Sequence, residues 1–336
     1  MRAHIGFAIT LSLLATPALA AAGYKIVPQI SDQPGVAPVQ DTDLVNPWGL
    51  AQLNDGAPVW TSDNGSDKST FYDRNSGAKQ TPVVQISPGA PTGIVAVPNG
   101  INFEVSEGGT TGRCYFIFDT ETGVISCWAP SVDDFNALVG YDGSGKGAVY
   151  KGLAIDAANQ HLFTADFARN RVEIVDTNWT QVGSFTDPDL PKHYAPFNVA
   201  VLNGKLYVAF AKHGSGIDEK HGKGLGLVDV FDLSGNFQTR LISGGALNAP
   251  WGLAIAPSSF GTFSNDLLVG NFGDGHINVY DPNTGAPLGT LSNKQGKPLK
   301  IDGLWALDPG PGTKQVQFSA GPDDESHGLI GLIKAN

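Results

Sequence analysis

Short apolar runs alternate along the chain with turns rich in Gly, Pro, Asn and Asp. Runs of this length between turn residues are typical of β-strands rather than helices. One short sequence motif, which we call the phrase, recurs. In it, a residue that is often aromatic precedes Gly or Asn, and two apolar residues follow. Its six copies lie at residues 47–51, 91–95, 150–154, 196–200, 250–254 and 301–305.

The spacing of the phrase predicts the fold. Successive copies are 44 residues (Gly49 to Gly93) to 59 residues (Gly93 to Gly152) apart, which is the period of β-propeller blades. We therefore predict an all-β, six-bladed β-propeller of four-stranded antiparallel blades. The fifth blade would use residues 251–256, 267–270, 276–280 and 288–291, and the third residues 152–155, 161–165, 171–175 and 181–185.

The last blade needs a strand from elsewhere, because the chain after Gly303 offers strands only near residues 315–320 and 328–333. The segment 24–30 is a free apolar strand before the first blade. We expect it to complete the last blade, so that the closed ring leaves no exposed edge. Residues 21–336 would then form a single domain, which we expect to be a monomer.

The N-terminus indicates export. Arg2 precedes an apolar run from Ile5 to Leu14, and Ala18-Leu19-Ala20 supplies small residues for cleavage. This is the pattern of a secretory signal peptide over residues 1–20, and the run is far shorter than the roughly 20 residues of a membrane span. We expect a secreted or periplasmic protein without a transmembrane segment in the mature chain.

Charge and cysteines refine this picture. A formal net charge of −11 argues against nucleic acid and anionic membranes as partners. Cys114 and Cys127 flank a Thr-Glu-Thr-Gly turn between apolar runs. A hairpin there would place the two cysteines opposite each other, and an exported chain favours their oxidation to a disulfide. A pair of half-buried thiols is the alternative.

Two insertions interrupt the period. One covers residues 102–112 in the second blade, and the other covers residues 212–224 between two strands of the fourth blade.

Candidate binding residues lie in the loops that join the outermost strand of one blade to the inner strand of the next, and in the loops that join the second strand of a blade to the third, since both sets of loops open on the same face around the propeller axis. A concave, partly aromatic rim with several polar groups is the default binding site. A small molecule, a glycan or a peptide is the expected partner. The residues expected to contact it are Trp48, Lys151, Asp166, Lys212, His213 and Trp251.

Calcium is the candidate cofactor, because Asn and Asp oxygens at strand ends suit a hard cation. The candidate ligands are Asn46, Asp63, Asn198, Asn271 and Asp302. The alternative is that these side chains cap turns. Zinc is disfavoured, because His213 and His221 lack the spacing and the cysteines of structural zinc sites.

Asn198 is distinctive, because the other five phrases have Gly at its position. If the side chain served only a ligand, Asn198→Gly would leave stability nearly unchanged and abolish binding.

Catalysis has one local candidate. Asp324, Glu325 and His327 lie close together near the C-terminus, and neighbouring carboxyls and a His can form a general base. The alternative is a solvated acidic turn bounded by Pro322 and Gly328. Nucleophilic Ser catalysis is disfavoured, because no Gly-x-Ser-x-Gly elbow is present.

The assembled phrases resemble an uncharacterised family of exported bacterial propellers related to NHL-repeat proteins. Some members end in a Pro-Glu-Pro sorting tail, which is absent from this chain, and the resemblance implies no particular activity. The matching stretches include Asn46-Pro-Trp-Gly-Leu50, Tyr194-Ala-Pro-Phe-Asn-Val199, Asn248-Ala-Pro-Trp-Gly-Leu253, Leu268-Val-Gly-Asn-Phe-Gly-Asp-Gly275 and Ala320-Gly-Pro-Asp-Asp-Glu325.

A looser similarity links the chain to six-bladed calcium-dependent lactonases and gluconolactonase-like hydrolases. Asn198 lies where those enzymes place a metal-binding Asn, whereas their acidic ligand near the first blade has no counterpart at Asn46-Pro47-Trp48. Two functions follow. An exported binding protein that uses the rim is the favoured one, and a calcium-dependent lactonase or esterase-like hydrolase that uses the same rim is the alternative.

Overall fold

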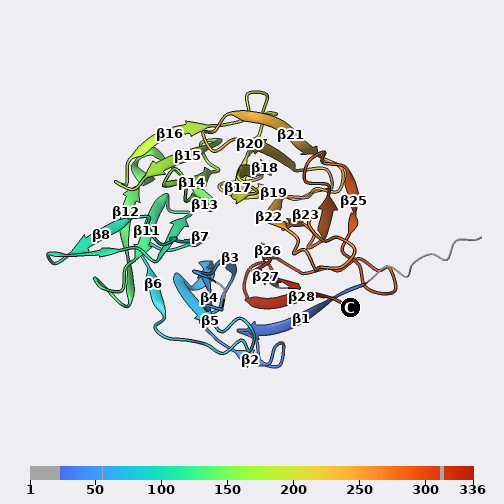
Figure 1. Cartoon of the computed structure of the whole chain (residues 1–336), viewed down its shortest axis with the longest axis horizontal. Helices are drawn as coiled ribbons and strands as arrows, with labels where there is room; N and C mark the ends of the chain where they lie inside the picture. The colour runs from blue at the N-terminus through green and yellow to red at the C-terminus, as the bar shows by residue number, and fades with distance from the viewer. Residues whose placement is uncertain (1–22, 55, 311–313) are drawn as a thin grey trace, which may run out of the picture.

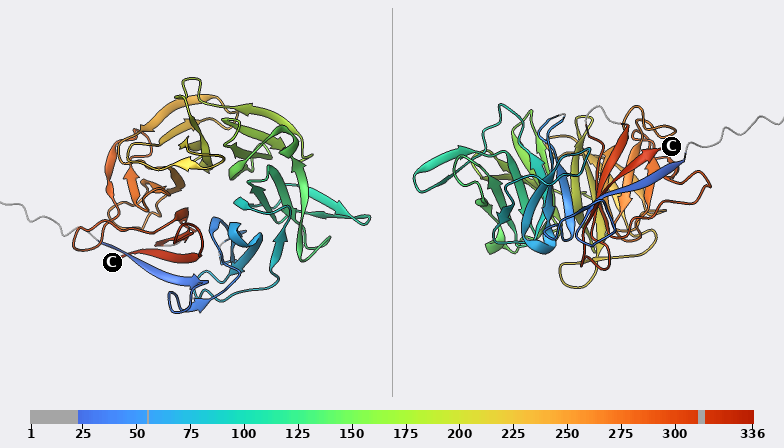
Figure 2. Two further views of the ribbon diagram at one scale, coloured as in Figure 1. Left: turned by 180° about the vertical axis from the view of Figure 1, so that it is seen from behind. Right: turned by 90° about the horizontal axis from the view of Figure 1, so that it is seen from below.

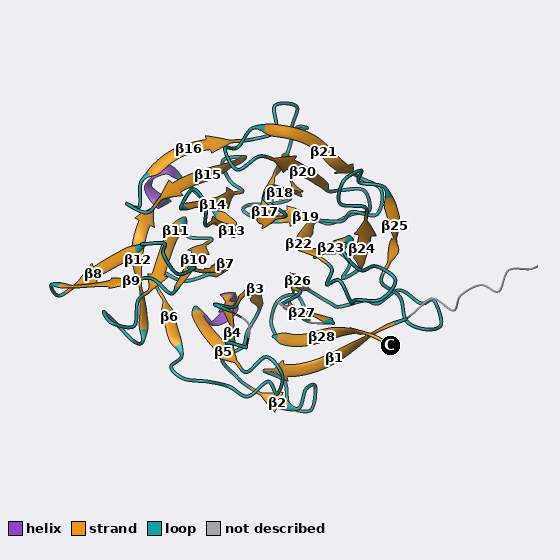
Figure 3. Cartoon of the chain, in the orientation of Figure 1, coloured by secondary structure: helices purple, strands orange, loops and turns teal. Residues whose placement is uncertain are grey.

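The structure is a computed structural model that describes residues 23–54, 56–310 and 314–336. The signal peptide expected over residues 1–20 lies outside the described residues. Strands dominate (Figure 3), and the helical turns in the described part are the 3-10 segments η1 (Asn64–Ser66) and η2 (Ser144–Lys146). The all-β prediction is confirmed.

The sheets surround a common axis (Figure 1), and their strands follow one another from the inside outwards. In three of these sheets, the strands lie side by side in their order along the chain. One holds β13 (Tyr150–Asp156), β14 (His161–Asp166), β15 (Arg171–Asp176) and β16 (Gln181–Phe185). The next holds β17 (Tyr194–Leu202), β18 (Lys205–His213), β20 (Leu227–Phe231) and β21 (Phe237–Ser243), with β19 (Glu219–Lys220) beside β18. A third holds β22 (Pro250–Ile255), β23 (Leu267–Asn271), β24 (Ile277–Tyr280) and β25 (Pro287–Thr290).

A longer sheet joins two such runs, because β6 and β12 pair in parallel at Gln85 and Asn136. The first run is β3 (Pro47–Ala51), β4 (Val59–Asp63), β5 (Lys68–Tyr72) and β6 (Val84–Ile86). The second is β7 (Pro91–Ala96), β10 (Phe116–Thr120), β11 (Val124–Trp128) and β12 (Asn136–Asp142). The predicted insertion at 102–112 forms the hairpin of β8 (Glu104–Glu107) and β9 (Thr110–Arg113), which projects from the ring (Figure 2).

The remaining sheet joins the two ends of the chain. β1 (Tyr24–Ser31) pairs antiparallel with β28 (Leu329–Ala335), which continues to β27 (Gln315–Ala320) and β26 (Leu304–Asp308). β2 (Val39–Gln40) lies outside β1. The predicted pairing of the N-terminal segment with the last strands of the chain is thereby confirmed, and Figure 1 shows β1 and β28 side by side.

The recurring phrase forms the innermost strands. β3, β7, β13, β17, β22 and β26 each contact the next, and β26 contacts β3, so these strands close a ring around the axis. Glycine allows this close approach. A Cβ at Gly93 would lie 2.3 Å from the backbone nitrogen of Leu153, and one at Gly152 would lie 2.1 Å from the Asn198 side chain.

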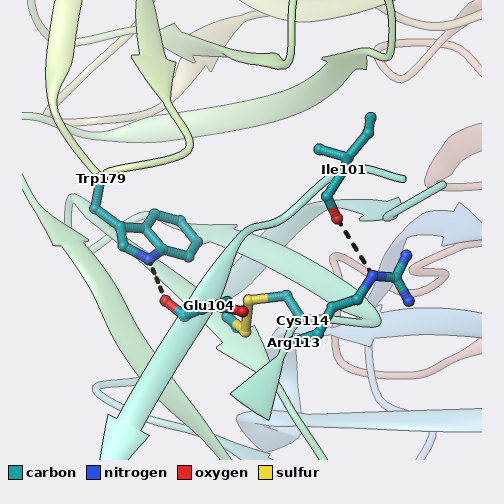
Figure 4. Close-up of a disulfide and its surroundings, with 6 residues drawn as sticks. Ile101, Glu104, Arg113, Cys114 and Trp179 are labelled. Atoms are coloured by element: carbon teal, nitrogen blue, oxygen red, sulfur yellow. Dashed lines mark hydrogen bonds between the residues drawn. A yellow bond between two sulfur atoms is a disulfide. The ribbon is translucent and has the colours of Figure 1, made fainter. Parts of the chain in front are cut away.

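The predicted disulfide between Cys114 and Cys127 is present, with the two Cα atoms 5.6 Å apart. The expected register is wrong, because Ile117 rather than Cys114 pairs with Cys127 in the hairpin of β10 and β11. Cys114 precedes β10 and donates its backbone N–H to Phe103. The bridge therefore lies beside the inserted hairpin, where Trp179 donates to the Glu104 carbonyl (Figure 4).

Bulky aromatic side chains fill the axis between the inner strands. They form one buried cluster with small residues from neighbouring strands, and the aromatic members are Trp48, Phe167, Phe197, Trp251, Phe272 and Trp305. No helix in the described part of the chain is long and apolar enough to span a membrane.

Candidate functional site

A cavity of about 300 Å³ opens at one end of the axis, directly over the aromatic cluster. Inner strands supply its floor, and loops on one face of the ring supply its wall. We call it the mouth cavity. Its lining residues are Trp48, Glu121, Lys151, Ile217, Asp218, Glu219, His221, Phe272, Trp305 and Glu325.

Stacked aromatic rings form the floor. The centroid of Trp305 lies 3.6 Å from that of Trp48 and 3.8 Å from that of Phe272, with nearly parallel planes. Trp251 meets Trp48 edge-on from below at 6.1 Å. All four rings are buried, so the floor is rigid and presents only limited ring surface to the cavity.

Lys151 is the charged residue set deepest in the site. Its side chain is only 2% exposed, and its ammonium forms an ion pair with Glu121. The Nζ atom also lies 5.1 Å from the centroid of Trp48, a cation–π arrangement. Because a buried charge is costly unless it is paired, Glu121 and Trp48 together hold this lysine in place.

A chain of hydrogen bonds joins Glu121 to Glu325 around the wall. Asn64 donates to Glu121 over 3.1 Å, and Asn46 donates to Glu325 over 2.6 Å. Asn46 also accepts a 2.9 Å hydrogen bond from Trp305 Nε1. The amide of Asn46 therefore connects the floor to the acidic wall.

Glu325 faces several like charges. Burial raises the pKa of its carboxyl, the Asn46 hydrogen bond and the Lys151 charge lower it, and the charges of Glu219 and Glu121 raise it, with a net rise. A carboxyl in such surroundings holds its proton more readily than an exposed one.

Glu325 is positioned by an unusual turn. Asp323, Asp324 and Glu325 are consecutive and have φ angles of +55°, +51° and +64°. Left-handed conformations are unfavourable for residues with a Cβ and cluster at functional sites. The turn aims Glu325 at the mouth cavity and leaves Asp324 exposed at its rim.

The insertion at 212–224 supplies another part of the wall. β19 pairs with the end of β18, which brings Ile217, Glu219 and His221 to the cavity. His221 Nε2 lies 3.1 Å from Glu219, and its ring meets Phe272 edge-on at 5.2 Å. The Glu219 hydrogen bond raises the pKa of His221, as do the charges of Glu219, Glu325 and Asp274, against an opposing effect of burial.

A second cavity of about 260 Å³ adjoins the first and shares three of its residues, His221, Phe272 and Glu325. Asp274, Asp302 and Asp324 line it, together with Lys300. The two cavities thus form one acidic depression.

A third cavity, of about 250 Å³, lies among the inner strands and shares no lining residue with the mouth cavity. Its lining residues are mostly of apolar type and include Leu153, Val199 and Trp251.

The predicted ligand-binding residues separate into two groups. Trp48 and Lys151 line the mouth cavity, and Trp251 supports it from below by donating Nε1 to the Lys151 carbonyl over 2.8 Å. The other three line none of these cavities. Asp166 is buried beside Arg169, 3.4 Å away, and His213 packs against Phe167 with its ring tilted and lies 2.8 Å from Asn170. Lys212 is half-buried at the end of β18.

The five predicted metal ligands do not share a centre. Three of them reach the acidic depression: Asn46 through Glu325, Asn271 through a hydrogen bond to Asp274, and Asp302, which accepts from the Asp323 N–H. Asp63 lies elsewhere and accepts from Thr70. Across the described ranges, no group of three or more His, Cys, Asp or Glu side chains is arranged to hold a metal ion.

Asn198 connects neighbouring inner strands. Its Nδ2 donates to the Trp251 carbonyl over 2.8 Å, and its Oδ1 accepts from the Val199 N–H. The amide is thus satisfied by backbone atoms, and its side chain is adjacent to the Gly152 backbone.

The predicted catalytic residues diverge. Glu325 faces the mouth cavity, whereas His327 Nδ1 lies 2.7 Å from Asp32 at the end of the N-terminal strand. Asp324 is exposed between them. The turn therefore does not assemble an acid–base pair of Glu325 with His327.

Sequence reasoning did not select Glu121, Glu219, His221 or Trp305 as site residues. Glu121 and Trp305 could have been found, because Glu121 follows the second strand of its run directly and Trp305 belongs to the repeated phrase of an inner strand. The two residues of the insertion carry no such signal, since the course of an insertion is independent of the repeat.

Comparison with known proteins places the chain among viral relatives. It is 34% identical over 336 residues to Uncharacterized protein L690 of Acanthamoeba polyphaga mimivirus, covering 94% of this chain and 87% of L690. This chain belongs to the same family as L690. Uncharacterized protein R648 of the same virus is 32% identical, covering 94% of this chain and 82% of R648. No family model matches.

A solved structure supports the fold alone. Kuenenia stuttgartiensis hydrazine synthase superposes with a TM-score of 0.55 at 14% identity, covering 86% of this chain and 77% of that chain.

Proposed function

We propose that the protein is a six-bladed β-propeller of the NHL-like type that binds a small polar ligand in the mouth cavity. Support for the architecture comes from the ring of inner strands, each of which leads outwards through three further strands of its own run. The strands β26, β27, β28 and β1 would be the last blade.

The observation that carries the binding function is the mouth cavity itself. It combines a rigid aromatic floor with hydrogen-bonding and charged side chains from distant parts of the chain. Concave sites with an apolar surface and a few convergent polar groups are typical ligand sites. The acidic wall favours a small polar molecule over an apolar one, because apolar ligands would leave the carboxylates desolvated and unpaired.

Filling the cavity tests this function. Ile217 is 44% exposed and lines the cavity from the insertion, so Ile217→Trp should block the cavity without disturbing the core. We expect it to abolish ligand binding and to leave Tm unchanged. The assay is a calorimetric screen of sugars, small metabolites and short peptides.

A matched control is Val182→Trp, since Val182 is 52% exposed on the outer strand β16. This variant should bind as the wild type does. Binding that survives Ile217→Trp would place the ligand elsewhere and contradict the proposal.

Hydrolysis is the second candidate, favoured by the raised pKa of Glu325 beside a cavity, a property of general acids. Lactone and ester substrates should then be turned over by the wild type and not by Glu325→Gln. Measurement of bound calcium and of the effect of a chelator tests the metal dependence of this candidate. A metal-free protein that is inert on the whole substrate panel would support the binding function instead.

A further inference from the structure

Negative charges outnumber positive charges in the mouth cavity. Lys151 is already paired with Glu121. Among the described residues, neither Glu219 nor Glu325 forms an ion pair with a lysine or arginine, and the only ionisable partner of Glu219 is His221. The adjoining cavity adds three carboxylates and one lysine. A ligand in this depression therefore meets excess negative charge.

Glu219 strengthens this point because its side chain is only 7% exposed. Carboxylates that are removed from water gain most from a positively charged partner. The turn that holds Glu325 and the insertion that holds Glu219 both line the cavity, and the two carboxylates are close enough for the charge of Glu219 to raise the pKa of Glu325. A protonated amine between them would contact both.

A second observation is independent of the carboxylates. Trp48 lines the cavity and is 2% exposed, yet its Nε1 donor has no hydrogen-bond acceptor. The other two tryptophans of the cluster donate to Asn46 and to the Lys151 carbonyl. Buried donors are nearly always paired, and an acceptor on a ligand bound beside the Trp48 ring would satisfy this donor.

The unpaired carboxylates and the Trp48 donor require different groups on one ligand. A metal ion or a simple polyamine offers positive charge but no acceptor for Trp48, and a neutral sugar offers acceptors but no charge. We propose that the mouth cavity binds a small hydroxylated amine, of which the amino sugars are the fitting class. Its ammonium would lie between Glu219 and Glu325, and a hydroxyl oxygen would accept from Trp48. This assignment rests on the binding function proposed above.

Calorimetry with glucosamine and glucose separates these requirements, because the two sugars differ by an amine in place of one hydroxyl. We expect glucosamine to bind at least about tenfold more tightly than glucose, as for the gain of one charge-assisted hydrogen bond. Added salt should weaken glucosamine binding and leave glucose binding unchanged.

Three variants assign the groups. Glu219→Gln and Glu325→Gln should each reduce glucosamine affinity about tenfold and leave glucose affinity unchanged. Trp48→Phe removes the donor and should weaken the binding of both sugars. Glu107→Gln is the control, because Glu107 is an exposed carboxylate on β8, in the projecting hairpin, and it should bind like the wild type. Circular dichroism and Tm establish that each variant is folded.

Three results would overturn the proposal. Equal affinity for glucose and glucosamine would show that charge does not select the ligand. Calcium binding that is lost in both glutamine variants, with no sugar binding, would make the carboxylates a site for an inorganic cation. Binding of a different class of ligand that Ile217→Trp still blocks would refute the amino sugar assignment while the mouth cavity remained the binding site.

Discussion

At the scale of single residues, buried polar side chains hold neighbouring parts of the ring together. Asp119 is fully buried and accepts hydrogen bonds from Thr92, the Gly93 N–H and Thr164 over 2.7 to 2.8 Å. These partners come from β7 and β14, which belong to different sheets. Burial raises the pKa of Asp119 to about 6, against the effect of these hydrogen bonds. Asp119 is thus a structural connector between neighbouring sheets.

Asn198 is a second connector, and it yields a stability prediction. Replacement by Ala removes the hydrogen bond to the buried Trp251 carbonyl and leaves that acceptor unpaired. We expect a loss of about 1–3 kcal/mol in the free energy of unfolding, measured by denaturant titration. Asn283→Ala, in an exposed turn, is the control. The sequence alone predicts that Asn198→Gly leaves stability nearly unchanged. An Asn198→Ala variant with the stability of the wild type would support that expectation and contradict the structural role of Asn198.

Asp229 predicts a dependence of stability on pH. Its side chain is fully buried beside Asp187 and Arg240. Burial raises the pKa of Asp229 to about 8, and the hydrogen bond and charge of Asp187 contribute to the rise. In the unfolded chain the pKa of Asp229 is that of an unperturbed Asp, about 3.9. Between these two values the folded protein keeps a proton that the unfolded chain loses, so this contribution to stability is complete below pH 4 and is lost as the pH rises to about 8.

The variant Asp229→Asn tests this behaviour, because an amide resembles the protonated carboxyl and cannot ionise. Its Tm should match that of the wild type near pH 4 and exceed it increasingly up to pH 8, measured by thermal unfolding in matched buffers. Asp134→Asn changes an exposed carboxylate and should show no such trend. A constant Tm difference across this pH range would mean that Asp229 is ionised throughout.

Some residue roles were predictable and others were not. Asp73, Asp176, Asp232 and Asp281 end strands, and each accepts backbone N–H groups from the next few residues, as the sequence suggests. Each of these turns is formed by a few consecutive residues, so it can be predicted from the local sequence. The separation of Glu325 from His327 was not predictable, because it depends on the left-handed turn before it.

At the scale of elements, the predicted strands agree closely with the observed ones. β16 and β27 have the predicted bounds, and most others differ by a residue or two at an end. Strand positions follow from apolar runs between turn residues, whereas pairing depends on contacts across the sheet. The hairpin of β10 and β11, which contains Cys127, shows the difference, since its strands were predicted and its register was not.

The N-terminal strand gives a prediction at this scale. β1 covers β28 along its length, from Tyr24 opposite Ala335 to Ser31 opposite Leu329. Deletion of residues 23–31 would expose an unpaired strand edge and the apolar side chains beneath it. We expect a strongly lowered Tm and aggregation, measured by thermal unfolding and size-exclusion chromatography.

A synthetic peptide of residues 23–31, added during refolding, should restore part of the lost stability, and a scrambled peptide of the same composition should not. An unchanged Tm after the deletion would show that β1 contributes nothing to ring closure.

At the scale of the whole molecule, the spacing of the repeated phrase predicted most of the arrangement of the strands. A phrase repeated at similar intervals must occupy equivalent positions, and its glycines are explained by the contacts that inner strands make around the axis. The site required more than the period. Trp48 and Lys151 belong to the repeated phrase and were predicted, whereas Glu219 and His221 come from an insertion that interrupts it.

The aromatic cluster on the axis also decides what can pass through the ring. The mouth cavity and the cavity among the inner strands share no lining residue, and the buried rings of Trp48, Trp251 and Trp305 lie where they meet. The axis is therefore a blind tunnel rather than a pore. We therefore expect a ligand that enters at the acidic end to leave by the same route, which makes the molecule a one-sided receptacle.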